Sequence, residues 1–213
     1  MRLSPRLGVL TLAVLVVGCG PKGAYQKAVE TSHRLDDIRT GLVTTKTQIS
    51  KTMASLDDLV NKPTGDLKAQ YKTFSDDVDK LNTSFTTMRD RVYDMRSNRD
   101  AYMQQWQSDV NALSSEELKD RARQRMDTAK ANFAKLSDSI NAVNDTSNAF
   151  LADVNDLRRY FGGDLTATGV KSVPDVVSRT HTEADATKAK IDAALVQLNT
   201  VNNAIAPTAT TQP

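Results

Sequence analysis

The chain has 213 residues, of which 28 are basic and 26 acidic, with two histidines, one cysteine and few aromatic residues. Arg2 and Arg6 account for the excess of positive charge, so the chain from Cys19 onward has 26 residues of each sign and a formal net charge of zero. This balance argues against a nucleic-acid partner, and one cysteine excludes an intrachain disulfide, so stability has to come from packing.

The first 18 residues have the layout of a secretory signal peptide. Arg2 and Arg6 precede an apolar run over residues 7–17. As a helix this run is about 16 Å long, which is too short for a hydrocarbon core of about 30 Å. A positive segment, a short apolar core and a small residue before a cleavage point are typical of signal peptides. We therefore expect residues 1–18 to be removed.

The end of this segment, Val16-Val17-Gly18-Cys19, resembles a bacterial lipobox. In such precursors the thiol receives diacylglycerol, cleavage falls between Gly18 and Cys19, and a fatty acid such as palmitate is added to the new terminus. The resemblance implies a lipid anchor on Cys19 and a short linker over 19–23. The alternative, a buried structural cysteine, is disfavoured because Gly20 and Pro21 break helices. Gly20, where retained lipoproteins have Asp, favours the outer membrane, facing the periplasm.

Four long helices are predicted for the remainder, at about 24–60, 66–113, 115–161 and 172–206, followed by an uncharged tail at 207–213 that we expect to be disordered. Apolar residues at heptad spacing mark the second and third helices most clearly. The second seam is Leu67, Tyr71, Phe74, Val78, Leu81, Phe85, Met88, Val92, Met95, Arg99, Tyr102, Trp106, Asp109 and Leu113. The third is Ala122, Met126, Ala129, Phe133, Leu136, Ile140, Val143, Ser147, Phe150, Val154, Leu157 and Phe161.

The second and third helices form an antiparallel hairpin that turns at Ser114, the predicted N-cap of a capping box with Glu117. In this register Phe85 faces Val143, Phe74 faces Val154, and Asp109 faces Lys119. Because the hairpin is longer than its flanking helices, its tip should project past both as a two-stranded coiled coil. The tip should lie at the same end as the lipid anchor.

The first and fourth helices have weaker seams. The first is Ala28, Thr31, Leu35, Ile38, Leu42, Thr45, Ile49, Thr52, Leu56 and Leu59. The fourth is Val177, Thr180, Ala184, Thr187, Ile191, Ala194, Leu198, Val201 and Ile205. Small residues dominate the first half of the fourth seam, which buries little area, so we expect that half to be looser. The fold class is therefore all-α: one elongated antiparallel bundle or coiled coil of three to four long helices over 24–206.

The sequence has no catalytic or metal-binding motif that we recognise. His33 and His181 belong to different helices, and both are expected to be surface residues. The stretch "FGGDLTATG" fits a loop that ends a helix better than a phosphate-binding loop. We predict no enzymatic activity, no catalytic residue, no metal and no cofactor beyond the covalent lipid on Cys19.

Two stretches could contact a partner. Arg99, Tyr102 and Trp106 combine residue types that dominate protein interfaces. The alternative for Arg99 is a polar layer that fixes the register of the hairpin. The basic segment "KDRARQR" at 119–125 is either a solvated face or a contact for anionic headgroups near the anchor.

The stretch from Tyr93 to Phe161 resembles a family of bacterial envelope lipoproteins known only as a domain of unknown function. The matching residues are a lipobox, Trp106 ahead of Ser114 and Ser115, and Phe150, Asp153 and Leu157 in a Phe-x-x-Asp-x-x-x-Leu pattern. The family continues with a His-Asn-Leu-Asn-Ala-like segment, where this chain has Gly163-Asp164-Leu165-Thr166-Ala167. The resemblance implies the helical fold and no mechanism.

These features predict a non-enzymatic, membrane-anchored lipoprotein of the bacterial cell envelope that acts as a structural or protein-interaction module. Its partners would be the membrane, through the lipid, and either another envelope protein or a second copy of itself. The alternative is a periplasmic carrier of a small molecule or metal, with a cavity in the bundle core beside the small residues of the fourth helix.

Overall fold

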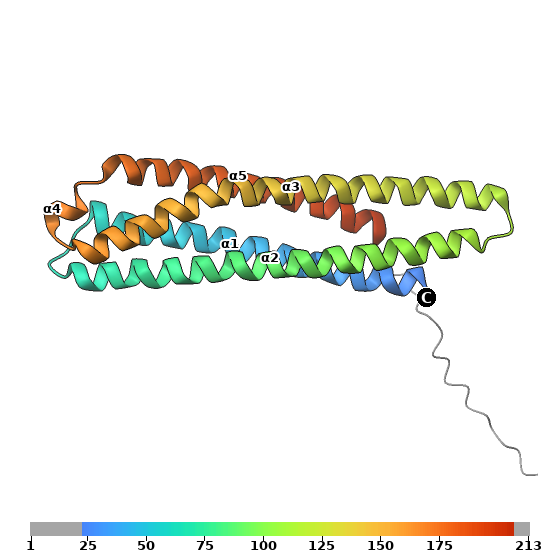
Figure 1. Cartoon of the computed structure of the whole chain (residues 1–213), viewed down its shortest axis with the longest axis horizontal. Coiled ribbons are helices and arrows are strands. Elements are labelled where there is room, and N and C mark those ends of the chain that lie inside the picture. The colour runs from blue at the N-terminus through green and yellow to red at the C-terminus, as the bar shows by residue number, and fades with distance from the viewer. Residues whose placement is uncertain (1–22, 207–213) are drawn as a thin grey trace, which may run out of the picture.

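The computed structural model describes residues 23–206, which form an elongated bundle of antiparallel helices (Figure 1). The elements are α1 (Ala24–Asn61), α2 (Leu67–Asn111), α3 (Glu116–Gly163), the short α4 (Ala167–Val170) and α5 (Pro174–Ile205). The predicted all-α fold is confirmed. The predicted signal peptide, Cys19 and the tail at 207–213 lie outside the described residues. No described helix is both long and apolar enough to cross a membrane.

The heptad seams form the core of the bundle. Every predicted seam position of α1 and α5 is buried, and in α3 only Ala122 is not. In α2 the seam is buried from Phe74 to Met95 and becomes partly exposed toward both ends. The first half of α5, which was expected to be looser, is buried as completely as the second half.

The closest helix packing differs from the prediction. The sequence paired α2 with α3 face to face in a hairpin, whereas the backbones approach most closely between α1 and α2 and between α3 and α5. Residue size gives the reason. Small or hydroxyl residues such as Gly41 and Thr52 in α1 and Ala184 and Thr187 in α5 allow close approach. Large residues such as Phe74 and Phe161, whose rings meet between α2 and α3, hold those two helices apart.

The turn between α2 and α3 occupies residues 112–115, as expected, but its capping residue is Ser115 rather than Ser114. The Ser115 hydroxyl accepts a hydrogen bond from the Leu118 amide at 3.4 Å. Across the hairpin, the ring of Phe74 meets that of Phe161, with centroids 6.3 Å apart, seven residues beyond the predicted partner Val154. The side chains of a helix lean toward the N-terminus of that helix. In an antiparallel pair, a residue of α2 therefore contacts a residue of α3 with a higher number than the one at the same backbone level.

The hairpin end is only partly free of the flanking helices. Figure 1 shows α5 ending well short of the α2–α3 turn, as predicted. The first helix, however, reaches almost to the turn, as the hydrogen bond from the Ala24 amide to Asp109 Oδ2 at 3.0 Å shows. The predicted two-stranded tip is therefore wrong on the α1 side. The contact also confirms that α1 begins at the same end of the bundle as the turn.

Gln70 closes the opposite end of the α1–α2 pair, a role that the sequence pattern does not reveal. Its side-chain amide donates to the Asp58 carbonyl, the Asp58 carboxylate and the Lys62 carbonyl, each at 2.9 Å. Its oxygen accepts from the Thr64 amide at 2.9 Å. One buried glutamine thus satisfies carbonyl groups left over at the C-terminus of α1.

Candidate functional site

Asp109 links the start of α1 to the end of α2. It was predicted to face Lys119, but Lys119 pairs instead with Glu116 at 2.7 Å. The Asp109 carboxylate accepts from the Ala24 amide and from Gln105 Nε2 at 2.8 Å. The first amides of a helix have no partner within the helix and carry partial positive charge, so they compete well for a carboxylate. Gly23, the residue before α1, provides no side-chain cap of its own.

The three predicted contact residues lie on α2 near the turn, in different environments. Tyr102 is 5% exposed and belongs to the core. It stacks against the partly buried Trp106, with ring centroids 5.4 Å apart. Burial raises the pKa of the Tyr102 hydroxyl to about 12, although the Arg125 charge opposes this shift. Arg99 is partly exposed and pairs with Asp100 at 2.7 Å. The surface available to a partner here is therefore Arg99 and the free part of Trp106.

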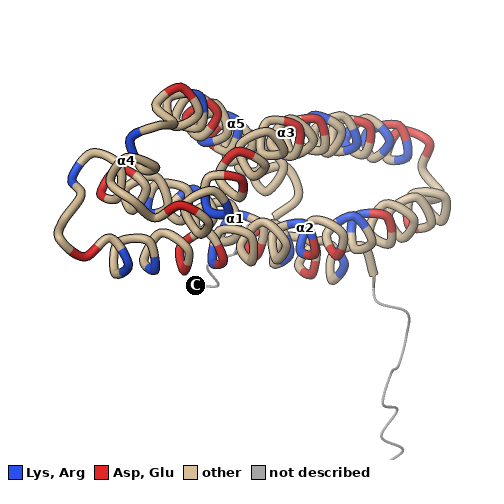
Figure 2. Tube along the Cα trace, turned by 60° about the vertical axis from the view of Figure 1, so that its left-hand side comes forward, with Lys and Arg blue, Asp and Glu red and all other residues tan. Residues whose placement is uncertain are grey.

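The basic segment at 119–125 has its charges largely balanced. Lys119, Arg121 and Arg123 each pair with an acid three or four residues earlier on α3. Figure 2 shows basic and acidic residues interspersed along α2 and α3. Arg121 and Arg125 also line a hollow with Ala204, where α5 ends against α3. These pairings favour a solvated face over a strongly basic headgroup site.

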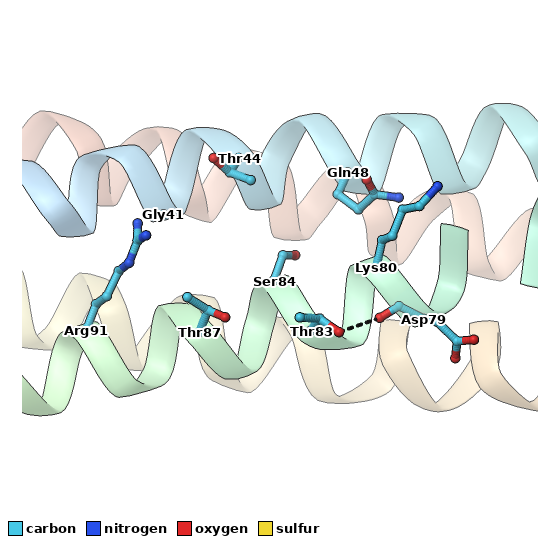
Figure 3. A pocket seen from close by; sticks show the side chains of 9 residues that line it. All are labelled: Gly41, Thr44, Gln48, Asp79, Lys80, Thr83, Ser84, Thr87 and Arg91. Carbon is cyan, nitrogen blue, oxygen red and sulfur yellow. Dashed lines mark hydrogen bonds between the residues drawn. The ribbon is translucent and has the colours of Figure 1, made fainter. Parts of the chain in front are cut away.

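A groove of about 450 Å³ runs along the outer side of the α1–α2 pair (Figure 3). Four of its nine lining residues bear a hydroxyl, Thr44, Thr83, Ser84 and Thr87, and Arg91 and Lys80 lie toward its two ends. Gly41 lets Arg91 pass close over α1, and the guanidinium donates to the Asp37 carbonyl at 2.8 Å. Gln48, on the opposite wall, donates to the Asp77 carbonyl at 3.0 Å. These two bonds tie α1 to α2 on either side of the groove.

The two histidines do not meet. His33 is exposed on α1, as predicted, while His181 on α5 is within 2.8 Å of Asp57 on α1. This contact belongs to a row of polar links between α1 and α5 that includes Lys46 with Asp192 at 2.5 Å. His181 is therefore a structural link at the helix interface. Within residues 23–206, no three histidine, cysteine or acidic side chains gather in a way that would hold a metal ion.

A carboxyl pair with one arginine bridges α3 and α5. Arg179 donates to both oxygens of Asp153, at 2.6 and 2.9 Å. Glu183 lies beside the same carboxylate, and its Oε2 is buried without a hydrogen-bond partner among the described residues. Burial and the negative charge of Asp153 raise the pKa of Glu183, while Arg179 counteracts this. Asp153, Arg179 and Glu183 thus form a charged group between two helices, which the spacing of single residues in sequence does not reveal.

Comparison with known proteins identifies the family. Residues 23–205 match the family model described as "Protein of unknown function (DUF2959)". The match spans every helix of the bundle. No curated protein matches the chain, and no solved structure does.

Proposed function

Because the chain belongs to this family of proteins of unknown function, we propose its role from its own sequence and geometry. We propose that it is a non-enzymatic lipoprotein of the bacterial envelope, anchored through Cys19 to the outer membrane on its periplasmic side. Its helical bundle presents a surface to another envelope component.

The hydrogen bond between the Ala24 amide and Asp109 is the observation that supports this proposal. It fixes the start of α1 beside the α2–α3 turn. Residues 19–23 reach at most about 18 Å even when fully extended. A lipid on Cys19 would therefore hold the turn close to the membrane. The 48 residues of α3 would extend about 70 Å away from it.

This arrangement gives the two ends of the bundle different roles. The turn and the nearby Arg99 and Trp106 would lie near the headgroups, while α4 and the α1–α2 connection would lie at the far end (Figure 1). A rod of this length would keep its two ends about 70 Å apart, with the Arg99 and Trp106 surface toward the membrane end. The balanced charges of the basic segment leave the lipid itself as the main membrane contact.

The anchor can be tested by metabolic labelling with a fatty acid in the native host. We expect the wild-type chain to be labelled and to fractionate with membranes, and Cys19→Ala to lose both properties. Gly23→Ala is the matched control, because a Cβ at this position meets no other atom within 4 Å. Label on Cys19→Ala, or no label on the wild type, would contradict the anchor.

The interaction role can be tested by crosslinking in intact envelopes followed by recovery of the acylated protein. Arg99→Ala combined with Trp106→Ala should reduce recovery of the partner, whereas Lys51→Ala, an exposed change on α1, should not. If the double variant stays folded and recovers the partner as well as the wild type does, the surface near the turn is not the contact.

A further inference from the structure

The strongest unassigned feature is a cluster of unpaired charges midway along α2 and α3. Most arginines of residues 23–206 pair with a carboxylate, but Arg89, Arg91, Arg96 and Arg125 do not. Arg91 is directed at α1, where it donates to a carbonyl. Arg89 and Arg96 are seven residues apart, which places them on one face of α2. Their side chains bond only neutral groups, Thr86 and Asn141, both at 3.3 Å.

The facing strip of α3 has the opposite charge. Asp138 and Asp145 are exposed, and their carboxylates have no hydrogen bond or ion pair to any residue in the described part of the chain. They lie three residues before and four residues after Asn141, so all three share one face of α3. Since Arg96 reaches Asn141, this face adjoins the strip that holds the two arginines. We call Arg89, Tyr93, Arg96, Asp138, Asn141 and Asp145 together the hairpin face.

Two further observations mark the hairpin face as a contact surface. Tyr93, between the two arginines, is 76% exposed, the largest exposed fraction among the big apolar side chains of residues 23–206. A hollow of about 260 Å³ lies between the helices, lined by Arg89, Tyr93 and Arg96 with Asn141 and Asn144. The Asn144 Oδ1 atom is buried and has no hydrogen-bond partner within the described residues. Exposed tyrosine and arginine around a hollow are typical of interface centres.

We propose that the hairpin face docks a second copy of this chain, side by side, about a two-fold axis parallel to the long axis of the bundle. In this arrangement α2 of each copy faces α3 of the other. Arg89 then pairs with Asp145 of the second copy, and Arg96 with Asp138. Both charge sets occur on every copy with the same spacing of seven residues, about 10 Å along a helix, so the surface is self-complementary as a two-fold interface requires.

The axial positions agree with this pairing. Rotation about an axis parallel to the bundle keeps every residue at its own level, so α2 meets α3 of the second copy in the same register as α3 of its own chain. Within the chain, contacting residues of α2 and α3 have numbers that add up to between 229 (Tyr71 with Arg158) and 237 (Asn82 with Asn155). For Arg89 with Asp145, and for Arg96 with Asp138, the numbers add up to 234, inside this range.

The same symmetry suits a membrane-anchored protein. A two-fold axis parallel to the bundle places both α1 N-termini at one end, so two lipid anchors could enter one membrane. An axis perpendicular to the bundle would place them at opposite ends. The dimer itself goes beyond the proposed lipid anchor and does not require it, since the interface is formed by residues of α2 and α3 alone.

The test is the mass of the full-length protein purified from its host in detergent, measured by light scattering or sedimentation over a range of concentrations. We expect a dimer for the wild type. Arg89→Asp with Arg96→Asp, or Asp138→Arg with Asp145→Arg, brings like charges together at every predicted pair and should weaken dimerisation by at least about tenfold. The four changes combined restore opposite charges and should return the dissociation constant to within about threefold of the wild type.

Mixing the two double variants provides a second measurement. Each should dimerise weakly alone, yet the mixture should form heterodimers with near wild-type affinity, because each mutated strip then faces a strip of opposite charge. Arg121→Asp with Arg123→Asp is the matched control, with the same charge change at exposed positions of α3 away from the hairpin face. Circular dichroism establishes that each variant is helical.

A monomeric wild type at all concentrations would overturn the proposal. So would a control that loses as much dimer as the hairpin-face variants, or a fourfold variant that stays monomeric while folded. Fatty-acid labelling of the same preparations reports the anchor separately. A labelled monomer would refute the dimer alone, and an unlabelled dimer would refute the anchor alone.

Discussion

Gln70→Glu is the most direct test of how the α1–α2 connection is held. The substitution keeps the size of the side chain and its acceptor oxygen for Thr64, but it replaces the amide donor by a carboxylate oxygen. Three donated hydrogen bonds of 2.9 Å, to two carbonyls and to the Asp58 carboxylate, become repulsive contacts between oxygen atoms. No other described side chain makes as many bonds to this connection.

The expected loss follows from those contacts, which share the two hydrogens of one amide group. At about 1 kcal/mol of net stability for each hydrogen, Gln70→Glu should lower the free energy of unfolding by about 2 kcal/mol at neutral pH. For a chain of this size that corresponds to a fall in Tm of about 4–8 °C. The deficit should shrink in acid, because protonating the added carboxyl removes its repulsion with Asp58. Urea unfolding followed by circular dichroism, at neutral and at acidic pH, measures both effects.

Gln104→Glu is the matched control, since Gln104 is exposed on the same helix. Its stability should stay within about 0.5 kcal/mol of the wild type. If Gln70→Glu is no less stable than Gln104→Glu at neutral pH, the bonds seen at Gln70 do not hold the connection, and the reasoning is refuted.

Substitutions at four further positions test other parts of the structure. Glu183→Gln should raise the free energy of unfolding at neutral pH, because the raised pKa of Glu183 means that ionising this carboxyl destabilises the native state. Urea unfolding below pH 4.5, the ordinary pKa of the group, should show no gain, because the carboxyl is then protonated in both states. Tyr102→Phe should remove one tyrosine that ionises at about 12 in a spectrophotometric titration, and an unchanged titration curve would place the phenol in water. Asp109→Ala should cost about 1 kcal/mol through loss of the α1 cap, and Asp109→Asn much less, as measured by urea unfolding. Phe85→Ala should cost about 3–5 kcal/mol in the same assay, and a loss under 1 kcal/mol would contradict its burial in the bundle core.

The candidate sites were only partly predictable. The basic segment, the exposed His33 and the seam positions of Tyr102 and Trp106 follow from residue types and heptad spacing, whereas the stacking of these two rings does not. The carboxyl pair of Asp153 and Glu183 does not, because its members are 30 residues apart on helices whose relative rotation no local pattern fixes. The hairpin face was missed for the same reason. Each of its charged residues has the pattern of an ordinary surface residue, and only the ion pairs of the neighbouring residues show that these charges are unpaired.

The sequence by itself determined the four long helices, their order and the faces that they bury, but not the short α4, which lies in a stretch predicted as a loop. Spacing of apolar residues is a local property, and a helix repeats it wherever its neighbours lie, so the seams could be assigned without a structure. It also determined that the chain turns between Ala112 and Ser115.

Tertiary structure alone decided which helices approach most closely and how their ends meet. How closely two helices approach depends on the side chains of both. Small residues in α1 and α5 allow these helices to lie near α2 and α3 respectively, whereas larger residues keep α2 and α3 further apart. The partner of Asp109 was decided in the same way. Lys119 is close to Asp109 in the sequence, whereas the Ala24 amide at the start of α1 is 85 residues away and only the fold brings it to Asp109.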